Sequence, residues 1–251
     1  MRQNLALSLR RIIPSLVTLC ALVAGMNALR LDLEGHLEAA LALLLVAMLL
    51  DALDGKIARL LNATSDMGAE LDMLSDFFNF GVVPAILIYH NLYADTDYAN
   101  LGWIASLSIA ICCALRLARF NVARKNGGSD DFFVGVPAPA LALLALMPVF
   151  MHLSDWNTPT HPFLRTVYVV GVGLLAISTI PTISIKHIGL RSPLSVPAAV
   201  LALIGIYCLL TNPWPTLVFA NFLYLAILPF YFLRRTRQAK NPRDTFAHSA
   251  D

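Results

Sequence analysis

Long apolar stretches, separated by short polar segments, run through almost the whole chain. Eight of these stretches are long enough for a helix to cross the roughly 30 Å of hydrocarbon in a bilayer. They fall at residues 13–30, 37–60, 68–92, 101–123, 137–153, 163–182, 194–211 and 214–233, and the one at 137–153 is the shortest. The pattern therefore predicts an all-α protein, a polytopic transmembrane bundle of about eight helices.

The composition excludes a soluble globular domain. The 251 residues are 58% hydrophobic and only 14% charged, and the mean hydropathy is +0.69, outside the usual range of soluble proteins. If both termini lie in the cytoplasm, every lysine and arginine except Arg30 and Arg165 falls at or near that side, as the positive-inside rule describes. We expect a multi-pass protein of the cell (inner) membrane whose active site faces the cytoplasm, with no nucleic acid partner.

The polar segments divide the chain into four parts. Residues 1–12 alternate charged and apolar groups, which suits either a short helix at the cytoplasmic interface or a disordered tail. Residues 13–182 form the expected membrane core of six helices, and residues 194–233 a C-terminal transmembrane pair. Residues 234–251 are basic and then polar, which is typical of a solvated cytoplasmic tail.

Four carboxylates stand inside this apolar sequence at helical spacings: Asp51, Asp54, Asp72 and Asp76. Each pair lies on one face of a helix, and the short loop between the two helices makes them antiparallel neighbours. Four unpaired carboxylates in a membrane would cost about 10 kcal/mol or more. A hard divalent cation, Mg²⁺ or Mn²⁺, prefers oxygen ligands and would offset that cost. The pattern predicts a two-metal site for phosphoryl transfer.

Small and basic residues accompany the carboxylates. Gly55 and Ala58 leave room for a ligand to approach the helix backbone. Arg59 precedes the loop, where it either contacts a phosphate or extends to the membrane interface. We expect Gly68 to let the second acidic helix pack closely on the first.

The spacing Asp-x2-Asp-Gly-x2-Ala-Arg-x8-Gly-x3-Asp-x3-Asp, from Asp51 to Asp76, resembles the signature of the CDP-alcohol phosphatidyltransferase family. The resemblance implies transfer of a phosphatidyl group from CDP-diacylglycerol to an alcohol with release of CMP, and a homodimer in membrane lipid. It also implies a set of residues that bind the cytidine diphosphate: Asp54, Gly55, Ala58, Arg59, Gly68 and Thr18.

Thr18 enters that set through the segment Pro14-Ser15-Leu-Val-Thr18, which resembles the family's first-helix pattern Pro-Asn-x-Leu-Thr. Ser15 stands where that pattern has Asn. The basic stretch ending at Arg11 and the apolar run after it have the form of a secretory signal. We expect the segment to be retained, because cleavage would remove this pattern.

The four carboxylates receive separate roles within the predicted site. Asp51, Asp54 and Asp72 are the expected main metal ligands, and Asp76 is a possible fourth. Asp76 lies one helical turn beyond Asp72, and the resemblance implies that Asp76 takes the proton from the incoming alcohol. Asp72 and Asp76 are therefore the expected catalytic residues.

Three further segments resemble members of the family, in bacteria and archaea, that use serine as the acceptor: residues 74–85, 116–122 and 133–140. This resemblance implies that L-serine is the acceptor alcohol and phosphatidylserine the product. Within the same family, the signature is equally compatible with a phosphatidylglycerophosphate or phosphatidylinositol-phosphate synthase.

Arg116, Arg119 and Asn121 are the candidate residues for binding the acceptor. The two guanidinium groups, three residues apart, project from the cytoplasmic half of the predicted fourth helix. Their partner is either a carboxylate of the acceptor, a phosphate of the donor, or the aspartates themselves in the empty enzyme.

A transporter for divalent metals is the alternative from a different functional class. Membrane aspartates would then line a path for the ion. Such a path needs polar groups toward the far side of the membrane, whereas residues 37–49 and 82–89 are almost wholly apolar.

Overall fold

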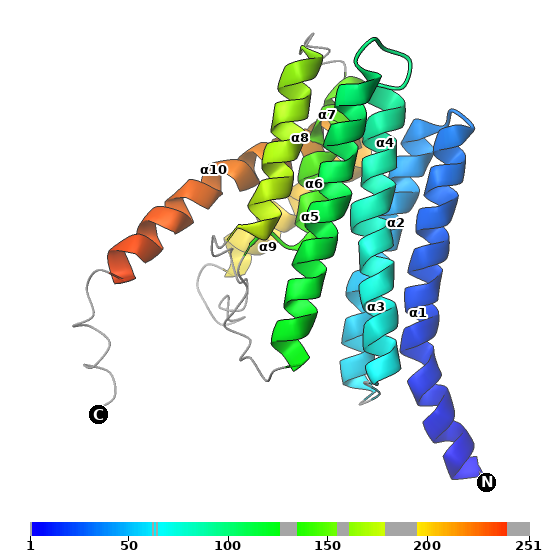
Figure 1. Ribbon diagram of the computed structural model, residues 1–251. Coiled ribbons are helices and arrows are strands. Elements are labelled where there is room, and N and C mark those ends of the chain that lie inside the picture. Colours follow the sequence, from blue (N-terminus) through cyan, green and yellow to red (C-terminus); the bar gives the residue numbers. More distant parts are fainter. Residues whose placement is uncertain are drawn as a thin grey trace.

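The computed structural model of this chain describes residues 2–61, 63, 65–125, 135–154, 161–178 and 195–239. Within these ranges the regular elements are all helical, and no strand is present, which confirms the predicted all-α class (Figure 1). The elements are α1 (Arg2–Leu33), α2 (Leu37–Leu60), α3 (Asp66–Phe77), the π-helix η1 (Phe78–Val82), α4 (Val83–Leu92), α5 (Ala99–Lys125), α6 (Ala138–Ala145), α7 (Met147–Leu153), α8 (Pro162–Ile177), α9 (Ser195–Thr211) and α10 (Pro213–Ala239).

In the described residues the helices follow the predicted spans, with four differences. α10 continues to Ala239, into the tail predicted from residue 234, while residues 240–251 of that tail and 179–182 of the predicted span 163–182 lie outside the described residues. The interfacial segment at 1–12 and the first span form one continuous helix, α1. The span expected at 68–92 is interrupted by η1, and the span expected at 137–153 is divided into α6 and α7. Pro148 lies in the first turn of α7, where its missing N–H removes no helical hydrogen bond.

The helices α1, α2, α4, α5 and α8 stand side by side in an upright bundle (Figure 1). α1 and α2 pack against each other, and α5 lies between α4 and α8. A tight turn reverses the chain between α1 and α2, where Gly35 takes a φ of 83° and His36 N–H donates to Leu31 O over 2.8 Å. A glycine at this position is typical of a helix C-cap.

Several helices are apolar enough for a membrane protein. In the described residues, three are also long enough to cross a bilayer, namely Ile12–Leu33, Asp66–Leu92 and Ala99–Ala123. Shorter apolar helices lie at Pro162–Ile177, Val200–Thr211 and Pro213–Pro229. Large apolar side chains are exposed along these helices, as membrane lipid requires. Examples are Val23, Met26, Trp103, Ile104, Leu201, Leu203 and Tyr207.

The core lies between α1, α2, η1, α4, α5, α6, α7 and α8, and its largest fully buried side chains include Phe80, Phe150, Leu41, Leu44 and Tyr93. α10 crosses the bundle obliquely and leaves it toward its C-terminal end (Figure 1). Two contacts fix its first half. Trp214 stacks on Phe150 of α7 with ring centroids 6.1 Å apart, and Asn221 Nδ2 donates to Leu143 O of α6 over 2.9 Å.

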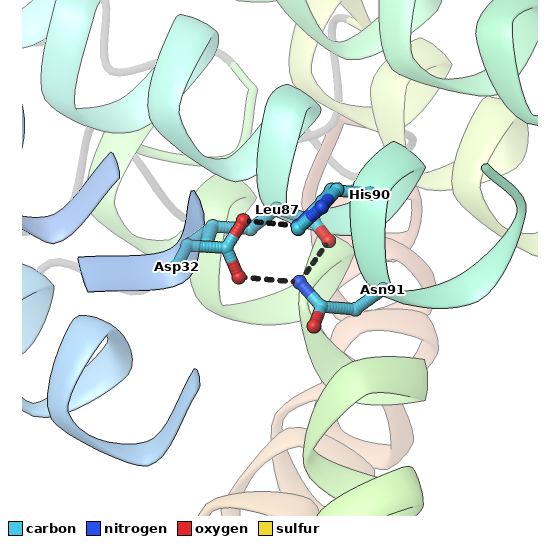
Figure 2. A network of polar contacts seen from close by, with 4 residues as sticks. All are labelled: Asp32, Leu87, His90 and Asn91. Carbon is cyan, nitrogen blue, oxygen red and sulfur yellow. Dashed lines mark hydrogen bonds and ion pairs between the residues drawn. The ribbon is translucent and has the colours of Figure 1, made fainter. Parts of the chain in front are cut away.

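A buried polar network joins α1 to α4 near the turn between α1 and α2 (Figure 2). The Asp32 carboxylate, at the end of α1, accepts a 2.7 Å hydrogen bond from Asn91 Nδ2 and lies 2.8 Å from His90 Nδ1. Asn91 also donates to Leu87 O over 2.9 Å. Both carboxylate oxygens have partners, so the burial of Asp32 is compensated.

Candidate active site

The two acidic pairs come from consecutive helices at the end of the bundle opposite this network. Asp51 and Asp54 lie in the last part of α2, and Asp72 and Asp76 lie in α3. Ser65 caps α3, since its hydroxyl accepts a 3.1 Å hydrogen bond from Gly68 N–H. The cap fixes where α3 begins and therefore which face of the helix carries Asp72 and Asp76.

Three of the predicted carboxylates converge. One oxygen from each of Asp51, Asp72 and Asp76 lies within 4.8 Å of the others. Oδ1 of Asp51 is buried and has no hydrogen-bond partner among the described residues. A buried carboxylate oxygen without a partner is costly, and three carboxylates so close repel one another. This all-oxygen donor set fits a divalent cation such as Mg²⁺ or Mn²⁺.

Asp54 lies beside this cluster rather than within it. Its side chain is only 3% exposed, and Oδ2 accepts a 2.6 Å hydrogen bond from Thr18 Oγ1 of α1. Thr18 Oγ1 also lies 3.1 Å from Pro14 O, one turn earlier. The hydrogen bond orients the Asp54 carboxylate and joins α1 to the acidic end of α2.

A pocket of about 290 Å³ adjoins the three-carboxylate cluster. α1, α2, α3 and the loop before α3 line it with Pro14, Ser15, Thr18, Asp54, Gly55, Ala58, Arg59, Ala63, Ser65, Gly68, Ala69 and Asp72. This lining contains all six residues predicted to bind the cytidine diphosphate. Asp72 belongs to both the pocket and the cluster, so a ligand in the pocket would lie beside the carboxylates.

The small residues of the pocket differ in what surrounds them. A side chain at Gly55 would point into open space, because no atom lies within 4 Å of its Cβ position. At Gly68 the neighbours are Ser65 Oγ and Ser15 Oγ of α1. The expectation that Gly68 brings the two acidic helices together is therefore wrong, because the close approach is to α1. Arg59 folds back along its own helix, where Nε donates to Gly55 O over 3.1 Å.

Arg116, Arg119 and Asn121 have different surroundings on α5. The Arg116 side chain is half-buried, and its guanidinium interacts electrostatically with Asp76. Arg119 is exposed, and its Nη1 donates to Ile177 O at the end of α8 over 3.2 Å. Asn121 is half-buried beyond them. Of the two arginines, Arg116 is thus the one whose charge acts on the carboxylate cluster.

Two buried polar residues behind the carboxylates were not predicted from the sequence. Ser75 Oγ donates to Thr18 O over 3.4 Å, and Asn79 Nδ2 donates to Ser75 Oγ over 3.3 Å. These bonds connect α3 and η1 to the same residue of α1 that holds Asp54. A polar pair spaced i, i+4 within an apolar span was the signal available in the sequence.

Comparisons with known proteins find similar sequences along most of the chain. The profile of the CDP-alcohol phosphatidyltransferase family matches residues 11–178. A Mycobacterium bovis protein named CDP-diacylglycerol–serine O-phosphatidyltransferase is 36% identical over 203 residues, covering 78% of this chain and 68% of that protein. Proteins of the same name come from Mycobacterium leprae, with 35% identity over 92% of this chain and 78% of that protein, and from Methanocaldococcus jannaschii, with 34% identity over 69% and 88%.

Proposed function

The chain belongs to the CDP-alcohol phosphatidyltransferase family, and from this premise we propose that it transfers the phosphatidyl group of CDP-diacylglycerol to the hydroxyl of L-serine. The products are CMP and phosphatidylserine. One observation carries the proposal: Asp72 belongs both to the three-carboxylate cluster and to the pocket lined by the residues of the family signature. The choice of serine rests on the names of the relatives.

The donor's cytidine diphosphate occupies the pocket between α1, α2 and α3. Gly55 leaves space for it, and Arg59, which lines the pocket beside Gly55, supplies positive charge. The pyrophosphate then lies next to Asp72 and the other carboxylates. Because phosphates and carboxylates are both anionic, the site requires cations between them.

Asp51, Asp72 and Asp76, with Asp54 beside them, hold one or two divalent ions, Mg²⁺ or Mn²⁺. Bound there, such ions neutralise the pyrophosphate and stabilise the CMP leaving group. The unpartnered buried oxygen of Asp51 supports this assignment. Thr18 keeps Asp54 oriented toward the pocket through its 2.6 Å hydrogen bond.

The serine hydroxyl attacks the phosphorus that carries the diacylglycerol. A new P–O bond forms, the bond between this phosphorus and the CMP oxygen breaks, and the hydroxyl proton goes to Asp76. Arg116 interacts with Asp76 and provides the positive charge for the serine carboxylate. Within the cluster, Asp76 therefore lies on the side of the serine, and Asp72 lies on the side of the CDP-diacylglycerol pocket.

Acceptors that carry a phosphate dianion are less well matched to these surroundings. A phosphatidylglycerophosphate or phosphatidylinositol-phosphate synthase needs a dense basic cluster. In the described part of the chain, Arg116 faces the carboxylates, whereas Arg119 is directed to Ile177 O. One guanidinium suits the single negative charge of an amino-acid carboxylate.

A metal transporter would need a polar path across the bundle. Beyond the cluster, the buried side chains include Leu41, Leu44, Phe80, Val83 and Leu87, which offer no ligand to a cation. Asp32, at the far end, is occupied by His90 and Asn91. These features favour a catalytic centre over a transport path.

The proposed orientation of the enzyme in the membrane follows from the unequal distribution of lysine and arginine along the sequence. We place the active site on the cytoplasmic side of the cell (inner) membrane, with residues 13–182 as the catalytic core, 194–233 as an added helix pair and 234–251 as a basic tail. The chain acts as a homodimer in this proposal. Cross-linking in native membranes, and accessibility of single cysteines placed at either end of the bundle, test these assignments.

The deciding experiment is CMP release by the purified protein in mixed micelles of CDP-diacylglycerol with Mn²⁺ or Mg²⁺. L-serine, glycerol 3-phosphate, inositol and inositol phosphate are offered separately. We expect serine-dependent release of CMP with formation of phosphatidylserine. Release with another acceptor alone would refute the assignment of serine, and no release with any of them would refute the transferase.

A further inference from the structure

The hydroxyl of Tyr224 on α10 is buried and has no hydrogen-bond partner among the described residues. Tyr224 follows Asn221 by one helical turn, and Asn221 fixes this side of α10 on α6. The ring packs against the core. A buried tyrosine hydroxyl normally finds a partner, so the position calls for a ligand that supplies one.

Arg116 of α5 also lacks a hydrogen-bond partner among the described residues. Its side chain is half-buried, and its guanidinium interacts electrostatically with both Asp76 and Tyr224. In the described parts of the chain, no hydrogen bond or ion pair joins Arg116 to another group. A half-buried guanidinium from α5 and a buried hydroxyl from α10 therefore lie near enough to interact electrostatically, and neither has a hydrogen-bond partner among the described residues.

These donors lie away from the walls of the donor pocket. That pocket is lined by α1, α2, α3 and the adjoining loop, and neither Arg116 nor Tyr224 contributes to it. Asp76 links the two regions, since it belongs to the cluster with Asp51 and Asp72 and interacts electrostatically with Arg116. In an in-line displacement the attacking oxygen enters opposite the leaving group. The Arg116 side of the cluster is thus the side from which the acceptor arrives.

We propose that Tyr224 and Arg116 together bind the carboxylate of the acceptor amino acid, with the Tyr224 hydroxyl as a determinant of acceptor specificity. This inference rests on the proposed function. A guanidinium and a neutral hydroxyl donor match a carboxylate, whose two oxygens accept both. Tyr224 lies beyond residues 11–178, which the family profile covers, so the C-terminal helix pair would contribute part of the acceptor site.

The variant Tyr224→Phe tests the proposal because it removes the hydroxyl alone. A hydrogen bond to a charged group contributes enough for a loss of about tenfold or more in affinity. We expect the KM for L-serine to rise by about tenfold, while the KM for CDP-diacylglycerol and the dependence on Mn²⁺ stay unchanged. The matched control is Tyr207→Phe on α9, whose side chain is 68% exposed and whose substitution should change none of these values.

Two further measurements separate binding from a structural role. Ethanolamine lacks the carboxylate of serine, so Tyr224→Phe should lower the ratio of kcat/KM for serine to that for ethanolamine by the same factor. The melting temperature of the variant should equal or exceed that of the parent, because the lost hydroxyl has no partner in the free protein.

An unchanged KM for serine, or an equal rise in the KM values for serine and CDP-diacylglycerol, would overturn the role of Tyr224. A lowered melting temperature together with an unchanged selectivity ratio would also overturn it. If the parent protein releases no CMP with serine, the proposed function itself is wrong. If the parent protein uses serine and the Tyr224→Phe variant has the same KM for serine, only this inference is refuted and the proposed function stands.

Discussion

Thr18 Oγ1 donates a 2.6 Å hydrogen bond to Oδ2 of Asp54, and the two residues are 36 positions apart in the sequence. Both side chains are buried. The hydrogen bond ties the first helix to the acidic end of the second, at the wall of the pocket that both residues line. A residue expected to bind the donor thus also positions a carboxylate.

Replacement of Thr18 by valine keeps the shape of the side chain and removes its donor. The buried Asp54 carboxylate then loses a hydrogen bond, which costs about 1.5–3 kcal/mol for a charged acceptor. We expect Thr18→Val to lower the free energy of unfolding by about that amount and to raise the KM for CDP-diacylglycerol. Thr18→Ser retains the donor and is the control. Equal stability of the valine variant and the parent would show that the bond contributes nothing.

Removing one charge from the carboxylate cluster should lower catalysis but should not lower the stability of the metal-free protein. Asp72→Asn or Asp76→Asn removes one of three charges that lie within 4.8 Å of one another. CMP release should fall by about a hundredfold or more, as it does when a group that stabilises a transition state is lost. The metal-free variants should melt at or above the temperature of the metal-free parent, because like-charge repulsion is relieved.

Metal binding is measured separately from activity by its effect on melting. A ligand at 100 times its Kd stabilises the native state by about 2.7 kcal/mol, so Mn²⁺ should raise the melting temperature of the parent and chelation should reverse the rise. Asp72→Asn should reduce this shift. Asp95→Asn, in an exposed loop position, should retain it. A full shift in Asp72→Asn would remove Asp72 from the metal site.

The polar network of Figure 2 predicts a residue that affects stability but not the active site. Asp32→Ala leaves His90 and Asn91 without their shared acceptor, and the loss should cost about 2–3 kcal/mol. The KM values of the folded variant should match those of the parent, because the network lies at the opposite end of the bundle. Altered KM values would instead indicate that the network and the active site, at opposite ends of the bundle, are coupled.

Glu34→Gln provides the comparison for that experiment. It breaks the Arg30–Glu34 ion pair of the same turn, whose side chains are 72% and 44% exposed. Exposed ion pairs contribute less than about 1 kcal/mol. Unfolding in denaturant should therefore rank Glu34→Gln close to the parent and Asp32→Ala well below it.

The relative positions of site residues could be predicted from the sequence where they depend on spacing within one helix. Asp72 and Asp76 are one turn apart, so their shared face follows from the helical period alone. Asp51 lies in one cluster with them because the loop that connects α2 to α3 is short. The separation of Asp54 from the cluster was not predictable, since Thr18 reaches Asp54 from a distant helix. The electrostatic interaction between Arg116 of α5 and Tyr224 of α10 likewise joins residues far apart in the sequence.

The spans of the fold were predictable from apolar length, and their interruptions were not. The break between α6 and α7 coincides with Pro148, a signal that was present in the sequence. The π-helix η1 depends on tertiary packing: Gly81 lies against Cys113 of α5, and Asn79 lies against Gly25 of α1. A hydropathy pattern cannot predict such contacts, because they join residues far apart in the chain.

Gly25 offers a test of how closely α1 must approach η1. A methyl group at Gly25 would collide with Oδ1 of Asn79. Asn79 is fully buried, and its Nδ2 donates to Ser75 Oγ. Overpacking of this kind costs about 1–3 kcal/mol. We expect Gly25→Ala to reduce stability and also kcat, because Ser75 precedes Asp76 and a displaced α3 would misplace its carboxylate.

The matched substitution is Gly205→Ala on α9, where no atom lies within 4 Å of the Cβ position. In a helix this change is stabilising by about 0.5–1 kcal/mol, so the two alanines should move stability in opposite directions. Thermal melting in detergent, with CMP release measured beside it, makes the comparison. If Gly25→Ala lowers stability while kcat remains that of the parent, the packing of α1 on η1 supports the fold without positioning the carboxylates.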